Sequence, residues 1–380
     1  MKQEQMKNLS FLSLMIGFLV ALTSCNGESQ SRRTGDTQID ITLHGGAERL
    51  LILEKLDVGE RVMIDTLELD DEGKGSFFVN VNSVSLLSVR KINEQGEIIF
   101  IGDKGVEIEI VAEDSALANS FRLAGSAENE ALDNFVVLER EYQFLKDSLN
   151  RIYLALQKKN QHFVVEEEFN KIYKDRMLER EERVKAFIDA HEGQFVNLLA
   201  VRSLDFKRFP EYYKKVKEDL EEGFSQSEHV KVFVRDVNRV MASAVGGLAP
   251  DFTLPMVSGK TGSLQDYKGK VLLLDFWATW CRPCIAEIPN LTAVHEQFKA
   301  ENFEILSICV DRNDFKPNWQ KIIENYEMDW PQFFDGTGVA AQEYAIEYFP
   351  TIFLLNEKGE IIAKNIRVEE ITSRLRALFQ

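Results

Sequence analysis

The sequence has few cysteines, no excess of positive charge and no long apolar run, and each of these absences argues against a class of protein. Only four cysteines occur in 380 residues, so a dense disulfide framework does not hold the chain together. The formal net charge of −17 argues against nucleic acid as a partner, because phosphate binding needs a basic face. Hydrophobic residues make up 44% of the chain, which is ordinary for a soluble protein of two or three domains.

An apolar run near the start, residues 9–22, is shorter than the ~20 residues that a membrane-spanning helix needs. It follows two lysines and fits a secretory signal peptide. The run ends in the letters LTSC, at Cys25, which resembles the lipobox of bacterial lipoproteins. The resemblance implies that residues 1–25 are a lipoprotein signal peptide and that acylated Cys25 binds a lipid membrane. The alternative is a plain signal peptide with an incidental cysteine.

After a polar linker at residues 26–38, the pattern predicts a β-rich domain at residues 39–125. Apolar and polar residues alternate over residues 39–43, 77–81 and 106–110, and glycine-containing turns separate such stretches. Short alternating strands of this kind predict an antiparallel sheet or a β-sandwich.

The period becomes helical over residues 126–245, with further helices expected at 164–188, 195–206 and 229–245. A heptad pattern runs along residues 135–156. Its apolar members are Phe135, Leu138, Tyr142, Leu145, Leu149, Ile152 and Leu156. Two interpretations compete: an intramolecular helical hairpin, and a homodimer formed through a coiled coil of this helix.

Residues 248–380 predict an α/β domain, in which a buried strand at 271–276 precedes a helix that ends near Phe298. Between them stand Cys281 and Cys284, at the CxxC spacing typical of thiol chemistry. A structural disulfide or half a zinc site is the alternative, but the sequence has no second Cys/His pair at zinc spacing. We therefore predict no metal and no cofactor. Cys309 lies in another apolar strand and is interpreted as a small core residue rather than a third redox thiol.

Six short motifs mark the C-terminal domain. They are Ala249-Pro250-Asp251-Phe252, Leu274-Asp275-Phe276-Trp277-Ala278, Trp280-Cys281, the CxxC pair, Glu287-Ile288-Pro289 and Phe349-Pro350-Thr351. Together they resemble the thioredoxin superfamily, in its TlpA/ResA-like branch of membrane-tethered periplasmic thiol-disulfide oxidoreductases. More loosely, residues 39–125 resemble the β-rich domain of unknown function that precedes thioredoxin modules in gram-negative lipoproteins. The expected fold is a C-terminal thioredoxin fold after a β-sandwich-like domain and a helical region.

The two cysteines receive distinct roles from their places in the motif. Cys281 is expected at the exposed start of the helix, where the macrodipole and free N–H groups favour its thiolate, so it is the predicted nucleophile. Cys284 lies one turn further on, sheltered, and would resolve the mixed disulfide. Together they would form the redox-active disulfide.

Two carboxyl groups compete for the proton chemistry. Asp275 lies in an apolar strand, where burial should raise its pKa, and the resemblance implies that it exchanges a proton with Cys284. The resemblance also offers Glu287, and the division of labour between them stays open. The family resemblance further implies a cis peptide bond before Pro350. It also implies a substrate-binding rim formed by Trp280, Phe349, Pro350 and Thr351.

The resemblance favours a reductant of disulfides in envelope proteins, in cytochrome c maturation for example. It would act on the periplasmic face of a membrane, and an electron donor in the membrane would reduce its disulfide again after each reaction. An oxidase or isomerase of protein disulfides, and a non-catalytic envelope scaffold, remain as alternatives. A peroxiredoxin shares the fold but needs Thr or Ser three residues before its cysteine and Pro seven before it. Ala278 and Leu274 stand there, so that interpretation fails.

Overall fold

The computed structural model describes residues 35–379, except 46–48, 93–95 and 159–161. The predicted signal peptide, its Cys25 and most of the linker at 26–38 lie outside the described residues. Among the helices that the structure describes, none is both long and apolar enough to cross a membrane.

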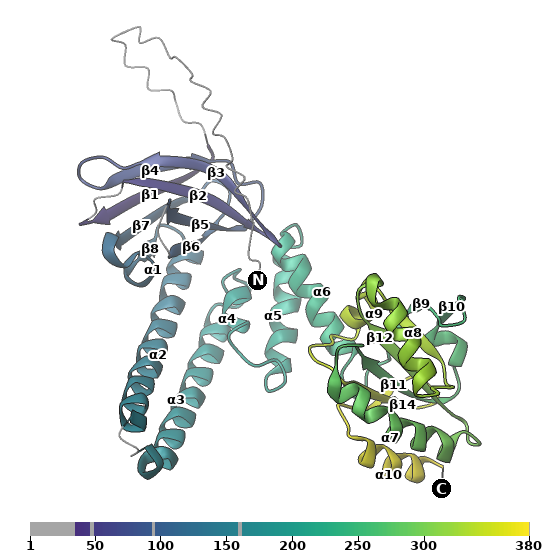
Figure 1. Ribbon diagram of the computed structural model, residues 1–380. Helices are drawn as coiled ribbons and strands as arrows, with labels where there is room; N and C mark the ends of the chain where they lie inside the picture. The colour runs from purple at the N-terminus through teal and green to yellow at the C-terminus, as the bar shows by residue number, and fades with distance from the viewer. Residues whose placement is uncertain (1–34, 46–48, 93–95, 159–161, 380) are drawn as a thin grey trace, which may run out of the picture. The chain divides into compact units, whose positions relative to one another are not determined.

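The N-terminal part of the described chain is rich in β-strands, as predicted (Figure 1). Its two four-stranded sheets have the orders β4-β1-β7-β8 and β3-β2-β5-β6, and the inward side chains of both belong to one apolar core. The pairing is antiparallel except between β1 and β7, which run parallel. The strands are β1 (Thr37–His44), β2 (Leu50–Asp57), β3 (Glu60–Glu68), β4 (Lys74–Val79), β5 (Ser85–Lys91), β6 (Glu97–Gly102), β7 (Glu107–Glu113) and β8 (Arg122–Ala124).

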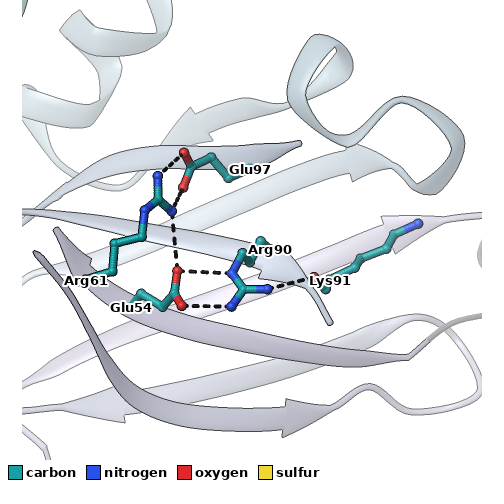
Figure 2. Close-up of polar contacts among 5 residues, drawn as sticks. All are labelled: Glu54, Arg61, Arg90, Lys91 and Glu97. Atoms are coloured by element: carbon teal, nitrogen blue, oxygen red, sulfur yellow. Dashed lines mark hydrogen bonds and ion pairs between the residues drawn. The ribbon is translucent and has the colours of Figure 1, made fainter. Parts of the chain in front are cut away.

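A chain of ion pairs links all four strands of the second sheet (Figure 2). Glu54 on β2 is buried and accepts hydrogen bonds from Arg90 on β5, at 2.9 and 3.1 Å. Arg61 on β3 contacts Glu54 at 3.4 Å and binds Glu97 on β6 through two contacts of 2.7 Å. Beside them, Arg90 also donates to the carbonyl oxygen of Lys91. The Arg61–Glu97 pair therefore connects the two edge strands of the sheet, β3 and β6.

The middle of the chain is helical, as predicted. Its long helices α2 (Ala127–Lys158) and α3 (His162–Ala190) lie side by side as a hairpin (Figure 1). Phe135 packs against Phe187 with tilted rings whose centroids are 5.3 Å apart, and Arg180 binds Glu139 at 2.7 Å. The heptad residues thus lie in an intramolecular hairpin, the first of the two predicted arrangements, while the homodimer stays a prediction.

Three shorter helices follow the hairpin, α4 (Asn197–Val201), α5 (Pro210–Gly223) and α6 (Glu228–Ala242). Helix α4 is shorter than the predicted 195–206, and α5 has no counterpart among the predicted helices. Helix α5 buries Val216 and Leu220, one turn apart. This apolar stripe is too narrow to stand out in a charged segment.

The C-terminal part has the predicted thioredoxin-like fold, a sheet of order β13-β12-β11-β14-β15 with helices packed against it (Figure 1). Strands β11, β12 and β13 are parallel, and β14 and β15 are antiparallel to their neighbours. The strands are β9 (Thr253–Pro255), β10 (Thr261–Ser263), β11 (Val271–Trp277), β12 (Phe303–Val310), β13 (Gln332–Asp335), β14 (Thr351–Leu355) and β15 (Ile361–Lys364). The helices are α7 (Arg282–Phe298), α8 (Lys316–Asn325), α9 (Val339–Glu343) and α10 (Val368–Leu378).

Alternation along the central strand β11 divides the C-terminal part into two apolar cores. Leu273 and Trp277 belong to the core that contains both cysteines of the CxxC and the apolar sides of α7 and α10. Leu274 and Phe276 belong to the other core, which includes Tyr344 beside α9. Because strand side chains alternate with a period of two, Asp275 faces the core that contains the cysteines.

Candidate active site

The CxxC begins where β11 gives way to α7. Cys281 is the N-cap of α7, and Pro283 lies in its first turn, where a missing N–H costs nothing. The Cys281 Sγ accepts a hydrogen bond from the backbone N–H of Cys284, at 3.2 Å. A sulfur in this position is stabilised as a thiolate by the N–H groups and the dipole of the helix.

The structure joins Cys281 and Cys284 in a disulfide with a Cα–Cα distance of 5.3 Å. In this form each cysteine is only 4% exposed, so the difference in accessibility predicted between them is not visible. The physical reason is that each sulfur covers the other, and both belong to an apolar core with Ala278 and Ile288. Preferential exposure of Cys281 stays a prediction for the dithiol form.

Asp275 lies in the same core, 4% exposed. Burial, above all, raises its pKa to about 7; a hydrogen bond from Ser307 opposes the shift, and the negative charge of Glu287 adds to it. The Ser307 Oγ donates this bond to the Asp275 Oδ2 at 3.0 Å. Glu287 is half-buried on α7. The structure therefore places both candidate carboxyl groups within electrostatic reach of each other.

Two polar residues that contact Asp275 directly or through one another were not predicted from the sequence. Ser307 on β12 is fully buried and lies opposite Asp275 in the strand register. Its Oγ also accepts a hydrogen bond from the indole Nε1 of Trp330, at 3.0 Å. A serine inside the apolar stretch FEILSICV was the available signal, because a buried hydroxyl needs partners.

Aromatic side chains form a rim beside the disulfide. Trp280 is 64% exposed and meets Phe349 edge to face, with ring centroids 5.7 Å apart. The Phe349–Pro350 bond is cis, as the family resemblance implies. Thr351 pairs with Phe276 across β14 and β11, and its hydroxyl donates to the carbonyl oxygen of Tyr348. These contacts bring the four predicted rim residues to the end of β11, where the CxxC begins.

Sequence reasoning missed two further residues at this end of the sheet. Tyr348 is 48% exposed, directly precedes Phe349 in the chain, and accepts the Thr351 hydroxyl through its carbonyl oxygen. Asp311, which follows β12, accepts hydrogen bonds from the backbone N–H and the hydroxyl of Thr279, at 3.2 and 2.6 Å. The Asp311 carboxylate therefore holds the loop that carries Trp280 and Cys281.

One group among the described residues could offer three ligand atoms to a metal ion, namely His295, Glu296 and Asp329. His295 lies near the C-terminal end of α7, at the opposite end from the CxxC. Glu296 and Asp329 are exposed, and Glu296 already pairs with Lys299 at 2.5 Å. The group therefore lies away from the disulfide.

Comparison with known proteins agrees with this geometry. The sequence model of the AhpC/TSA family matches residues 245–364. Thiol-disulfide oxidoreductase ResA of Geobacillus thermodenitrificans is 33% identical over 140 residues, 36% of this chain and 79% of that protein. Thioredoxin-like protein YneN of Bacillus subtilis is 34% identical over 130 residues, 34% of this chain and 74% of that protein.

Among solved structures, the thioredoxin domain of a thiol-disulfide oxidoreductase from Bacteroides vulgatus is similar at 32% identity and a TM-score of 0.34. The match covers 36% of this chain and 99% of that one. The sequence relatives share only the C-terminal part, where the disulfide, the buried carboxyl and the cis-proline lie. Through that thioredoxin-fold domain, the chain belongs to the family of ResA-like thiol-disulfide oxidoreductases.

Proposed function

We propose that this oxidoreductase reduces disulfides of envelope proteins, with Cys281 as the attacking thiolate. The observation that carries the proposal is the position of the Cys281 Sγ at the N-cap of α7, where it accepts the N–H of Cys284. Helix N-termini stabilise thiolates, and the thiolate is the attacking form. The resemblance to ResA-like proteins supports the reducing direction.

The proposed reaction has two displacements that balance in electrons and protons. The Cys281 thiolate attacks one sulfur of the substrate disulfide, forms a mixed disulfide and expels the other sulfur as a thiolate. Cys284, once deprotonated, attacks the Cys281 sulfur and releases the second substrate thiolate, which takes up a proton. The substrate gains two electrons, and the protein ends as the Cys281–Cys284 disulfide. A dithiol donor in the membrane must then reduce this disulfide again.

Insulin reduction by the purified chain, started with dithiothreitol, tests the assignment. Cys281→Ala should abolish the activity, whereas Cys284→Ala should accumulate a mixed disulfide with the substrate. The control Cys309→Ala should keep wild-type activity, since Cys309 is buried and outside the disulfide. Retained activity in Cys281→Ala would show that the nucleophile is assigned wrongly.

The reduction potential of the pair tests the direction of the reaction. A reductant should lie nearer the roughly −270 mV of thioredoxin than the roughly −120 mV of the strong oxidant DsbA. A potential at the oxidising end would favour the oxidase alternative.

We further propose that the protein acts from a membrane surface, anchored by lipid on Cys25. The support is the LTSC ending of the short apolar run, and cytochrome c maturation is the candidate process. After a salt wash, the wild-type protein should stay with membranes and Cys25→Ala should not. If Cys25→Ala sediments like the wild type, the anchor is not this cysteine.

A further inference from the structure

A chain of three buried polar groups runs from the active-site face of β11 to the segment that precedes β13. The Trp330 Nε1 donates to the Ser307 Oγ, and the Ser307 Oγ donates to the Asp275 Oδ2, each at 3.0 Å. All three residues are at most 4% exposed. The two donors come from elements other than the strand that carries the carboxyl, because Ser307 is on β12 and Trp330 precedes β13.

The direction of these bonds follows from the donor inventory. An indole N–H can only donate, so it occupies an acceptor position of the Ser307 oxygen. The hydroxyl proton of Ser307 then points to Asp275, the carboxylate within reach. A hydroxyl that receives a hydrogen bond becomes a stronger donor. Trp330 thus both orients Ser307 and strengthens the bond that Ser307 makes.

We propose that Ser307 and Trp330 are positioning residues that set the ionisation of Asp275, and through it the pH range in which Cys284 resolves the mixed disulfide. This inference rests on the proposed function. Burial of Asp275 disfavours its charge, and a donated hydroxyl proton favours it. The two effects oppose each other at one carboxyl, so the serine keeps Asp275 able to both give and accept a proton near neutrality.

Other titratable groups that face Asp275 do not replace this pair. Glu287, from α7, carries a like charge that raises the Asp275 pKa. Cys309, on the same face of β12, is a buried thiol whose pKa is raised, chiefly by burial. Cys281 and Cys284 do not titrate while they form the disulfide. On the other side, the strand partner of Asp275 in β14 is the apolar Ile352. Ser307 is the group that stabilises the carboxylate.

The test uses the oxidised full chain, so it does not depend on activity. The ionisation of Asp275 is followed by ¹³C NMR of aspartate side-chain carboxyl groups against pH, with Asp275→Asn to assign the signal. Ser307→Ala should raise the midpoint by about 1–2 pH units, the size expected for losing one hydrogen bond to a charged group. Trp330→Phe should raise it by less. Cys309→Ala, on the same strand face, should leave it unchanged.

A second readout covers the case in which Trp330→Phe fails to fold. In the wild type, the Trp330 indole N–H resonance should move with the same midpoint as Asp275, because ionisation pulls the serine proton and strengthens the indole bond. The movement should vanish in Asp275→Asn and in Ser307→Ala.

An unchanged Asp275 midpoint in Ser307→Ala, or an indole signal that ignores the titration in the wild type, overturns the inference. Failure of the wild type to reduce insulin would instead count against the proposed function, and it would leave this titration intact. Where reduction occurs, the pH profile of mixed-disulfide resolution should move upward with the Asp275 midpoint.

Discussion

At the scale of single residues, the main question is which carboxyl moves the proton of Cys284. Asp275→Asn should slow resolution of the mixed disulfide by ~10²–10⁴-fold, the range for a lost general acid–base, and affect the first attack by Cys281 far less. Rapid-mixing kinetics separates the two steps. Glu287→Gln is the matched control. A wild-type resolution rate in Asp275→Asn, together with a slow rate in Glu287→Gln, would assign the proton to Glu287.

The same substitution should change stability in a pH-dependent way. The pKa of Asp275 rises from an ordinary 3.8 to about 7 in the folded chain. A raised carboxyl pKa gives stability that is fully present below the unfolded pKa and is lost as pH rises through the folded pKa. Asp275→Asn should therefore match the wild type near pH 4 and exceed it above pH 7, by at most roughly 4 kcal/mol for three pKa units. Urea unfolding across this range measures it, and equal gains at both ends would contradict it.

Substitution of the exposed rim residue Trp280 should affect the binding of protein substrates without affecting the exchange reaction itself. Trp280→Ala should raise the KM for a protein disulfide several-fold, because the exposed indole and Phe349 form an apolar surface for an extended chain. Reduction of a small aromatic disulfide should hardly change, since the substituted ring holds neither sulfur. Steady-state kinetics on both substrates checks this, and equal loss on both would mean that Trp280 supports the disulfide itself.

The predictable part of the site is the part that lies within continuous motifs. Cys281, Cys284 and Pro350 stand in such motifs, and Asp275 stands out as an acid in an apolar strand. Ser307 and Trp330 are 23 positions apart and meet through the parallel pairing of β12 with β13, while the pairing of β11 with β12 places Ser307 opposite Asp275. No local pattern encodes these pairings, so these partners could be found only in the structure.

At the scale of elements, the ion pairs of the second N-terminal sheet should matter more than ordinary surface charges. A hydrogen bond from Arg90, first of all, holds the Glu54 pKa below its usual range. Arg90→Met would leave a buried carboxylate with only the more distant Arg61, and should cost about 1–3 kcal/mol. Arg49→Met is the control, because Arg49 pairs with the exposed Asp71 and should cost almost nothing.

The pH dependence of the stability cost of Arg90→Met shows whether that cost comes from the lost ion pair with Glu54 or from lost packing. A lowered carboxyl pKa contributes stability above the unfolded pKa, near 4.5, and loses it as pH falls through the folded pKa. The cost of Arg90→Met should therefore be full at pH 7 and shrink below about pH 4.5. Thermal unfolding at both pH values decides, and a cost independent of pH would point to packing.

Helices and strands could be predicted where apolar residues recur with a regular period, and they were missed where that period is weak. The heptad residues of α2 and the alternation of β1 and β7 are regular. Helix α5 buries only two residues among many charges, so its sequence hardly differs from a loop. The parallel pairing of β1 with β7 joins strands about seventy residues apart, which turn signals cannot reveal.

At the scale of the whole molecule, no apolar core of the described chain combines residues of the N-terminal part with residues of the C-terminal part. One core contains residues between Ile39 and Val237, and the other two contain residues between Ala249 and Leu375. The disulfide belongs to one of the two C-terminal cores.

We expect scanning calorimetry to show that reduction of the disulfide lowers the unfolding temperature of the C-terminal part and leaves that of the N-terminal part unchanged. A reducing dithiol pair is one whose disulfide is strongly favoured in the folded state, so the oxidised fold is the more stable. The variant with both cysteines replaced by serine should not respond to dithiothreitol. A transition that rises on reduction would place the protein among oxidants.

The close burial of the two sulfurs has a consequence for which thiols can reduce the disulfide. Because each cysteine is only 4% exposed in the disulfide, a reacting thiol must approach along the sulfur–sulfur axis, past the aromatic rim. A macromolecular partner can gain contact area with the exposed Trp280 on the way, whereas a freely diffusing small thiol gains little. The oxidised protein should therefore take its electrons from donors large enough to dock, and a small thiol should reduce it slowly.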